Sequence, residues 1–550
     1  MRGLVPPRPP APARLGPARG RGGILVTLVA AALSAGCDPA AGGPDRGSTM
    51  TILAAGDDLI EVQLHAPKYL LFLPLVDRYG PEVRPRLATS WDHSPDLRVW
   101  TFHLREDVRW HDGVPVTAHD IRFSLELFSH PDVLFPAGWY PASTFESVAV
   151  PDDHTLVVRL KRPSSAPPVG IPLSEWTVYF PRHLLEGLDP AGFYSWEFWT
   201  RPVGNGPYRF VRRLPRTMLE LGANPDFYAG EPSIRRVVVK FSGASPIAEL
   251  TSGDADVALS VTPSDRLKLE SDPRFIVYHQ YDWSELQAIY WNQSHPLFVD
   301  ARVRRALSHA IDRRVLARLL GYPDSMPLVG GISNEDLVDR PYRDDGWDQG
   351  PAYDPELAAR LLTQAGWIDS DGDGVREKDD GEARFTLLVP NSDGTPARDQ
   401  GIFVQDQLRR VGVGMEIRTV EWGAAQDLVR QGAYEAALAS VDNTPDGILV
   451  KWLGEPPPGG SDRWSGRPAP FGYRSQEAAR LLRALFRETD LDVQDTLYAE
   501  VNGIFRQDMP VTFLFPMVAS HVAHRRIRGL RDGWPAFLGN AGELRMEPQP

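Results

Sequence analysis

Alternating apolar and polar side chains mark short strands in the first third of the chain. Residues 99–104 (VWTFHL) alternate strictly, which predicts a strand with one buried face. Residues 147–160 alternate on both sides of residues 152–153, a pair of aspartates, which predicts a hairpin that turns there. Residues 117–120 read TAHD, a pattern that resembles a capping box and predicts a helix running through about residue 127.

Helical spacing of apolar residues dominates the second half of the chain. The stripe within residues 300–312 follows Asp300, a suitable N-cap, and Asp354 opens another predicted helix that ends at Gly366. The same reasoning predicts helices at residues 397–411, 476–488 and 493–506, and strands at residues 413–420 and 511–515. Strands and helices that alternate over this length indicate an α/β protein with more than one sheet.

The first 37 residues have the order of a secretory signal. Five arginines and no acidic residue precede an apolar run at residues 24–33, and small residues lead to Cys37. The apolar run is too short for a permanent membrane span. Residues 33–37 (LSAGC) resemble a bacterial lipobox, which implies removal of residues 1–36 and a diacylglycerol on Cys37. The alternative is an ordinary secretory signal with a chance cysteine.

Composition narrows the function classes. The net charge of −13 disfavours non-specific nucleic-acid binding, which needs a basic face. Cys37 is the single cysteine, so disulfides within the chain and cysteine-based zinc sites are excluded. With 550 residues the chain is too long for one core, and two or three domains are expected.

Several motifs occur in an order that resembles one protein family. Residues 110–120 read WHDGVPVTAHD, residues 202–210 read PVGNGPYRF, residues 253–257 read GDADV, and residues 300–312 read DARVRRALSHAID. Together with residues 353–362 (YDPELAARLL), they resemble the family 5 extracellular solute-binding proteins, which include the oligopeptide- and dipeptide-binding subunits of ABC importers.

The resemblance implies an α/β, two-lobed periplasmic-binding-protein fold (class II type) with an additional inserted domain. The expected parts are a signal peptide (1–36), the lipidated cysteine and a flexible tether (37–46), a discontinuous first lobe (47–77, 180–285 and 509–550), the inserted domain (78–179) and a second lobe (286–508). Hinge closure would enclose the ligand between the lobes and deliver it to a permease. We expect the protein to be a monomer that binds no nucleic acid. Its lipid would anchor it to the membrane on the periplasmic side.

The predicted ligand-facing strand lies in residues 437–446 (ALASVDNTPD). In the family this strand pairs with the peptide backbone, and an Asp four residues before the proline holds the peptide ammonium. Here Val441 has that position and Asp442 follows it, so Asp442 takes the role through a shifted loop, or the ligand lacks a free amine, or Asp442 is only a turn residue. The expected contacts are Ala437, Ala439, Val441 and Asp442, flanked by Trp422 and Trp452.

Residues 369–380 follow the spacing of the twelve-residue calcium loop. The candidate ligands are Asp369, Asp371, Asp373, the carbonyl of Val375, Glu377 and Asp380. Asp replaces the usual Glu at the last position, and Arg376 replaces the usual apolar anchor. The prediction is a structural Ca²⁺ that clips the loop; the alternative is a solvated acidic hairpin. No other cofactor is expected.

A secreted hydrolase and a ligand sensor are the alternatives to solute binding. The sequence has no Gly-x-Ser-x-Gly elbow and no His-Glu-x-x-His zinc motif, which disfavours a secreted hydrolase and predicts no enzymatic activity. A ligand sensor for a signalling receptor stays open. Within transport, a sugar or a metal complex is the alternative to a peptide.

Overall fold

The computed structural model describes most of the chain after residue 47. The described residues are 48–54, 68–79, 82–130, 132–133, 145–161, 163, 178–241, 245–324, 326, 328–332, 350–379, 381–391, 397–442, 448–449, 453, 472–485, 487–488, 490–531 and 538–547. Cys37, the predicted tether, Asp380 and Trp452 lie outside them. Within these ranges no helix has the length and hydrophobicity needed to cross a membrane.

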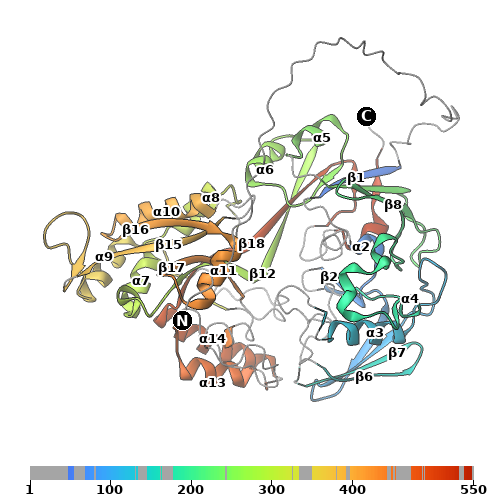
Figure 1. The fold of residues 1–550 in the computed structure, drawn as a ribbon, viewed down its shortest axis with the longest axis horizontal. Coiled ribbons are helices and arrows are strands. Elements are labelled where there is room, and N and C mark those ends of the chain that lie inside the picture. The colour runs from blue at the N-terminus through green and yellow to red at the C-terminus, as the bar shows by residue number, and fades with distance from the viewer. Residues whose placement is uncertain are drawn as a thin grey trace, which may run out of the picture. The chain divides into compact units, whose positions relative to one another are not determined.

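A ten-stranded mixed sheet runs through the molecule (Figure 1). In spatial order its strands are β16 (Gly414–Glu421), β15 (Arg384–Asn391), β17 (Ala436–Asp442), β12 (Phe275–Trp291), β18 (Val511–His524), β11 (Val257–Ala258), β1 (Thr49–Ala54), β10 (Arg236–Phe241), β9 (Met218–Ala223) and β8 (Tyr208–Leu214). The long central strands β12 and β18 pair antiparallel from Phe275↔His524 to Tyr290↔Val511. They therefore connect the strands on one side of the sheet with those on the other.

A second, four-stranded antiparallel sheet lies within the predicted inserted domain. Its order is β4 (Ala88–His93), β5 (Val99–Leu104), β7 (Thr155–Leu160) and β6 (Phe145–Asp152). Helix α3 (Ala118–Phe128) packs against β6 and β7. The strand at residues 99–104 and the hairpin at residues 147–160 are confirmed, and so is the capping box, in which the Asp120 carboxylate accepts the Thr117 N–H at 2.8 Å.

Helices cover both faces of the β15–β17–β12 region. The helices with described bounds in this half of the sequence are α7 (Ala301–His309), α8 (Arg313–Leu319), α9 (Pro355–Gln364), α10 (Ala397–Arg409), α11 (Trp422–Gln431), α13 (Gln476–Leu485) and α14 (Leu491–Asp508). Side chains of α7–α10 share a core with Ile289 and Leu438, whereas those of α13 and α14 share another with Ala288 and Val441. Successive residues of each strand point to opposite faces, so both faces are buried.

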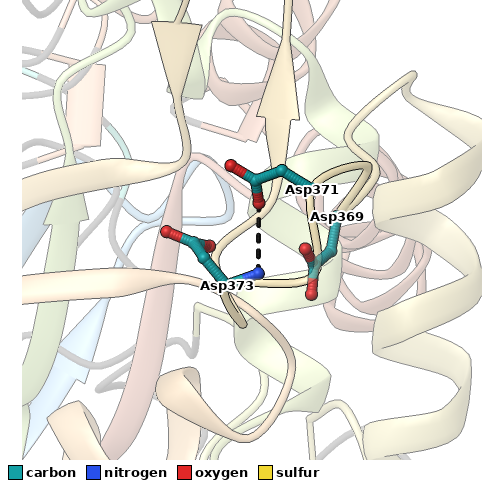
Figure 2. A group of neighbouring side chains, drawn as sticks. All are labelled: Asp369, Asp371 and Asp373. Atoms are coloured by element: carbon teal, nitrogen blue, oxygen red, sulfur yellow. Dashed lines mark hydrogen bonds between the residues drawn. The ribbon is translucent and has the colours of Figure 1, made fainter.

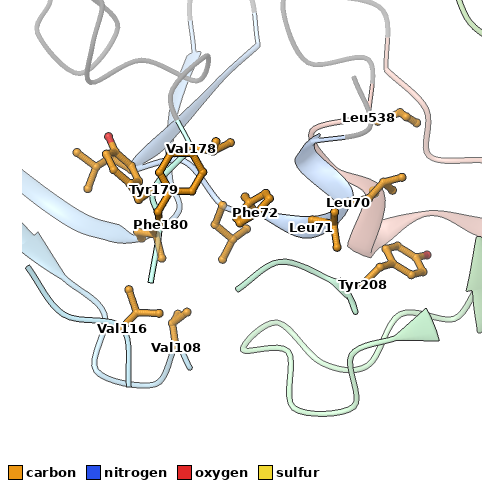
Figure 3. Packing of buried hydrophobic residues seen from close by; sticks show 14 of the residues in the cluster. Leu70, Leu71, Phe72, Val108, Val116, Val178, Tyr179, Phe180, Tyr208 and Leu538 are labelled. Carbon is orange, nitrogen blue, oxygen red and sulfur yellow. The ribbon is translucent and has the colours of Figure 1, made fainter. Parts of the chain in front are cut away.

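The end of α2 (Lys68–Leu71) lies in close backbone contact with residues 204–206. We call this contact the backbone crossing. The Leu71 carbonyl accepts the N–H groups of Asn205 and Gly206 at 3.0 and 2.8 Å. A Cβ on Gly204 would lie 1.9 Å from that carbonyl oxygen, so close approach explains the glycine. Around this crossing, Phe72 packs edge-on against Phe180 with ring centroids 6.0 Å apart (Figure 3).

His111, which belongs to the motif at residues 110–120, forms hydrogen bonds to two glycines of the same crossing. Its Nδ1 accepts the Gly204 N–H at 3.1 Å, which leaves Nε2–H to donate to the Gly206 carbonyl at 3.1 Å. Burial lowers the pKa of His111 to about 4, so the ring is neutral at pH 7 and can serve as both donor and acceptor.

Asp256, in the GDADV motif, also has a structural role, because its carboxylate bonds to distant segments. Its Oδ1 accepts from Arg526 Nε at 2.5 Å and its Oδ2 accepts the Thr51 N–H at 2.8 Å. Both charged side chains are buried. This carboxylate therefore ties β1, β11 and the segment after β18 together, three pieces that are far apart in the sequence.

Replacing Asp256 by alanine should lower the free energy of unfolding by about 3–5 kcal/mol, because the Arg526 guanidinium would stay buried without its carboxylate. Asp226→Ala removes the exposed partner of Arg209 and should cost less than about 1 kcal/mol. Urea unfolding at pH 7 measures both values. Equal, small losses in the two variants would show that the Asp256 pair does not hold the sheet together.

Candidate functional site

Among the described strands, β17 is paired along the whole of one edge and along only the first part of the other. Along its whole length it pairs with β12, from Trp291↔Ala436 to Glu285↔Asp442. On the other edge β15 pairs with it only at Ala436 and Ala437. Within the described ranges, no strand pairs with that edge beyond Ala437.

The hydrogen-bond phase of β17 decides which backbone groups face the open edge. The Asn292 N–H donates to the Glu435 carbonyl at 3.0 Å, and this pair continues the β12–β17 register by one residue. In an antiparallel ladder, alternate residues direct their N–H and C=O to the same neighbour. Residues 437, 439 and 441 therefore bond toward β12, while Leu438, Ser440 and Asp442 direct their backbone groups to the other edge.

The side chains of the predicted contacts are largely built into the core. Ala437 and Val441 are fully buried, and Ala439 packs beside them. Contact of these three residues with a ligand stays a prediction, but their backbone groups face β12. The open edge is instead lined by the backbone of Leu438 and Ser440, which the sequence pattern did not single out. Asp442 ends the strand on this same edge.

Trp422 is the first residue of α11 and follows β16 directly. Its side chain is 54% exposed. β15 lies between β16 and β17 in the sheet, so a neighbouring strand separates Trp422 from the predicted contact strand. Its proposed flanking role stays untested, and the other flanking residue, Trp452, lies outside the described residues.

The predicted calcium loop brings three of its carboxylates together (Figure 2). One oxygen each from Asp369, Asp371 and Asp373 lies within 4.8 Å of the others, and all three side chains are exposed. The Asp369 carboxylate accepts the N–H groups of Gly372 and Gly374, at 2.8 and 3.1 Å. Both glycines have positive φ, +80° and +90°, which the tight loop requires.

Arg376 and Glu377 hold the base of this loop. Arg376 donates from Nε to the Val411 carbonyl at 2.8 Å and from Nη1 to the Trp367 carbonyl at 2.9 Å, so a guanidinium anchors the loop where an apolar residue was expected. The Glu377 carboxylate accepts the Ser370 N–H at 2.7 Å and also the Ser370 hydroxyl. The hydroxyl bond is the main cause that lowers the pKa of Glu377. Its carboxylate is thus engaged with Ser370, and Asp380 lies outside the described residues.

Comparison with known families decides the class of protein. Residues 82–456 match the model of the bacterial extracellular solute-binding proteins, family 5. The chain belongs to this family. Membership confirms the resemblance seen in the motifs, and it makes the chain a solute-binding protein rather than an enzyme.

Similar proteins extend over most of the chain. Di/tripeptide-binding protein 2 of Pseudomonas aeruginosa is 27% identical over 463 residues, which is 78% of this chain and 80% of that protein. Oligopeptide-binding protein AppA of Bacillus subtilis, solved in complex with a nonapeptide, has a TM-score of 0.68 at 21% identity and covers 91% of this chain and 99% of its own. NikZ of Campylobacter jejuni, solved with Ni(L-His), has a TM-score of 0.69 at 24% identity, with coverage of 91% and 99%. These structures confirm the two-lobed α/β fold.

Proposed function

We propose that this chain is the substrate-binding subunit of an ABC importer and that it captures a peptide by adding it as a strand to the open edge of β17. The observation that carries this proposal is the β17 edge, with which no described strand pairs after Ala437. An extended peptide presents alternating N–H and C=O groups, which match the groups that Ser440 and Asp442 direct outward.

Backbone pairing explains how one site accepts varied peptides. It supplies affinity through the main chain and leaves specificity to the pockets that receive side chains. The expected two lobes would close over the bound strand by bending at the connecting strands, with residues 47–77, 180–285 and 509–550 as one lobe and residues 286–508 as the other. The names of the Pseudomonas and Bacillus proteins support a peptide ligand.

A metal complex is the second candidate ligand, because NikZ was solved with Ni(L-His). Such a ligand offers few backbone groups to the β17 edge. Binding of Ni(L-His) together with a failure to bind peptides would favour this alternative.

Asp442 is the carboxylate closest along the chain to the open edge, and we infer that it receives the ammonium of a peptide ligand. Asp442→Asn should lower the affinity for a tetrapeptide with a free amino group by about tenfold, in the range expected for a hydrogen bond to a charged group. The affinity for the N-acetylated tetrapeptide should stay unchanged. Asp427→Asn, on the exposed face of α11, is the matched control. Calorimetric titration measures all affinities, and unchanged binding of both peptides by the Asp442 variant would leave Asp442 as a turn residue.

We propose further that Cys37 carries a lipid that anchors the protein to the membrane beside the permease, which in a Gram-negative cell is the outer face of the inner membrane. Cells fed a labelled fatty acid should incorporate it into the wild-type chain, and Cys37→Ser should abolish the label. A wild-type protein released without lipid would contradict the anchor. The folded part and its ligand binding would be unaffected by that outcome.

We propose that Ca²⁺ binds between Asp369, Asp371 and Asp373, since hard cations prefer carboxylate oxygens and three are already gathered. Millimolar Ca²⁺ should raise the melting temperature of the metal-stripped protein, because a ligand that binds the folded state stabilises it. The double variant Asp371→Ala, Asp373→Ala should lose this response, and Glu356→Ala, an exposed acid on α9, should keep it. Identical melting curves with and without Ca²⁺ would identify the loop as a bare acidic turn.

A further inference from the structure

One backbone acceptor on the open edge of β17 already has a donor from within the protein. The Tyr290 hydroxyl donates to the Ser440 carbonyl at 2.9 Å. By the phase established above, Ser440 directs this carbonyl away from β12, toward the edge where an added strand would pair. The carbonyl faces the open edge, whereas its donor belongs to β12, which pairs with the other edge of β17.

The position of Tyr290 is fixed by packing. Its side chain is 5% exposed and lies in the core cluster that also contains Leu286, Ala288, Ala437 and Val441. A buried ring of this kind has little freedom to move when a ligand arrives. We therefore expect the hydroxyl to stay at the Ser440 carbonyl when a ligand binds.

We propose that Tyr290 determines which peptides are accepted, by satisfying the Ser440 carbonyl in place of a ligand N–H. This inference rests on the proposed strand addition at β17. Ser440 is exposed in this structure, and a peptide laid along the edge would exclude water from its carbonyl. A carbonyl that is covered without a donor is costly, so an enclosed site normally rejects a ligand that lacks the matching N–H. With Tyr290 as donor, the ligand residue opposite Ser440 needs no N–H. The site then accepts proline or another N-substituted residue at that position.

The effect of Tyr290→Phe follows directly. The ring and its packing are kept, while the Ser440 carbonyl loses its internal donor and must obtain one from the ligand once the ligand excludes water from the edge. The variant should therefore discriminate against a ligand without an N–H at that one position. A purely structural role of the hydroxyl would alter the affinity for all peptides alike and leave this discrimination unchanged.

The test compares penta-alanine with the analogues in which each amide bond in turn is replaced by an ester, which removes the N–H without adding bulk. Calorimetric titration of the full chain gives the affinity ratio of amide to ester at each position. At one position the ester should lower the affinity of the wild type less than about threefold and that of Tyr290→Phe about tenfold, the range expected for a carbonyl that the bound peptide covers without a donor. At the other positions the two proteins should give equal ratios.

Tyr473→Phe is the matched control, because Tyr473 lies in the same core cluster and its hydroxyl donates to Asp508 at 2.7 Å. It should give the wild-type ratio at every position. Equal ratios for the wild type and Tyr290→Phe throughout would overturn the role of Tyr290 while leaving the peptide proposal intact. Failure of both proteins to bind any of these peptides would overturn strand addition itself, and the role of Tyr290 with it.

Discussion

The pairing of β12 with β18 is the constraint on which the rest of the structure depends. These two strands lie at the centre of the ten-stranded sheet, with β17, β15 and β16 on one side and β11, β1 and β10–β8 on the other. Their register is interrupted between Asp282 and Leu286, in the stretch where the first lobe was expected to give way to the second. A slip of one residue in the pairing that follows, from Leu286 to Tyr290, would move these side chains of β12 to the opposite face of the sheet.

Buried polar groups fix the pieces that this pairing brings together. The Asp256–Arg526 pair joins β1 and β11 to the end of β18, and the neutral His111 ring holds the Gly204–Gly206 crossing. Both sites use a side chain from one family motif to satisfy backbone groups of a distant segment. These motifs therefore act in the architecture of the protein, and the proposed ligand chemistry lies elsewhere, on the backbone of β17.

Local signals in the sequence predicted many elements well, because a cap or an alternation is decided by neighbouring residues. Asp300 and Asp354 do accept the N–H groups of Arg302 and Leu357 at their helix starts, and Gly366 ends its helix with positive φ. The strand predicted at residues 511–515 extends to residue 524 instead. Its second half contains Ser520 and His521, which are buried, and His521 is bonded to Gln280 on β12, so hydropathy alone understates the strand.

The candidate site was less predictable from the sequence, because it depends on contacts between distant segments. The segment at residues 437–442 could be placed on a strand, but its open edge depends on how far β15 reaches along it. That reach is set by tertiary packing and has no local signal. The same holds for Ser440, whose importance comes from the direction of its carbonyl and from the Tyr290 hydroxyl on another strand. The acidic loop was the opposite case, since its candidate ligands are close in sequence and the carboxylates of three of them do gather.

The most direct test of the central claim is amide hydrogen exchange in β17, measured with and without a bound peptide. Strand addition predicts that a peptide slows exchange at the amides of Ser440 and Asp442, whose N–H groups face the open edge. The amides of Ala439 and Val441, already bonded toward β12, should change little by comparison. A peptide that binds tightly and leaves exchange at Ser440 and Asp442 unchanged would contradict the account.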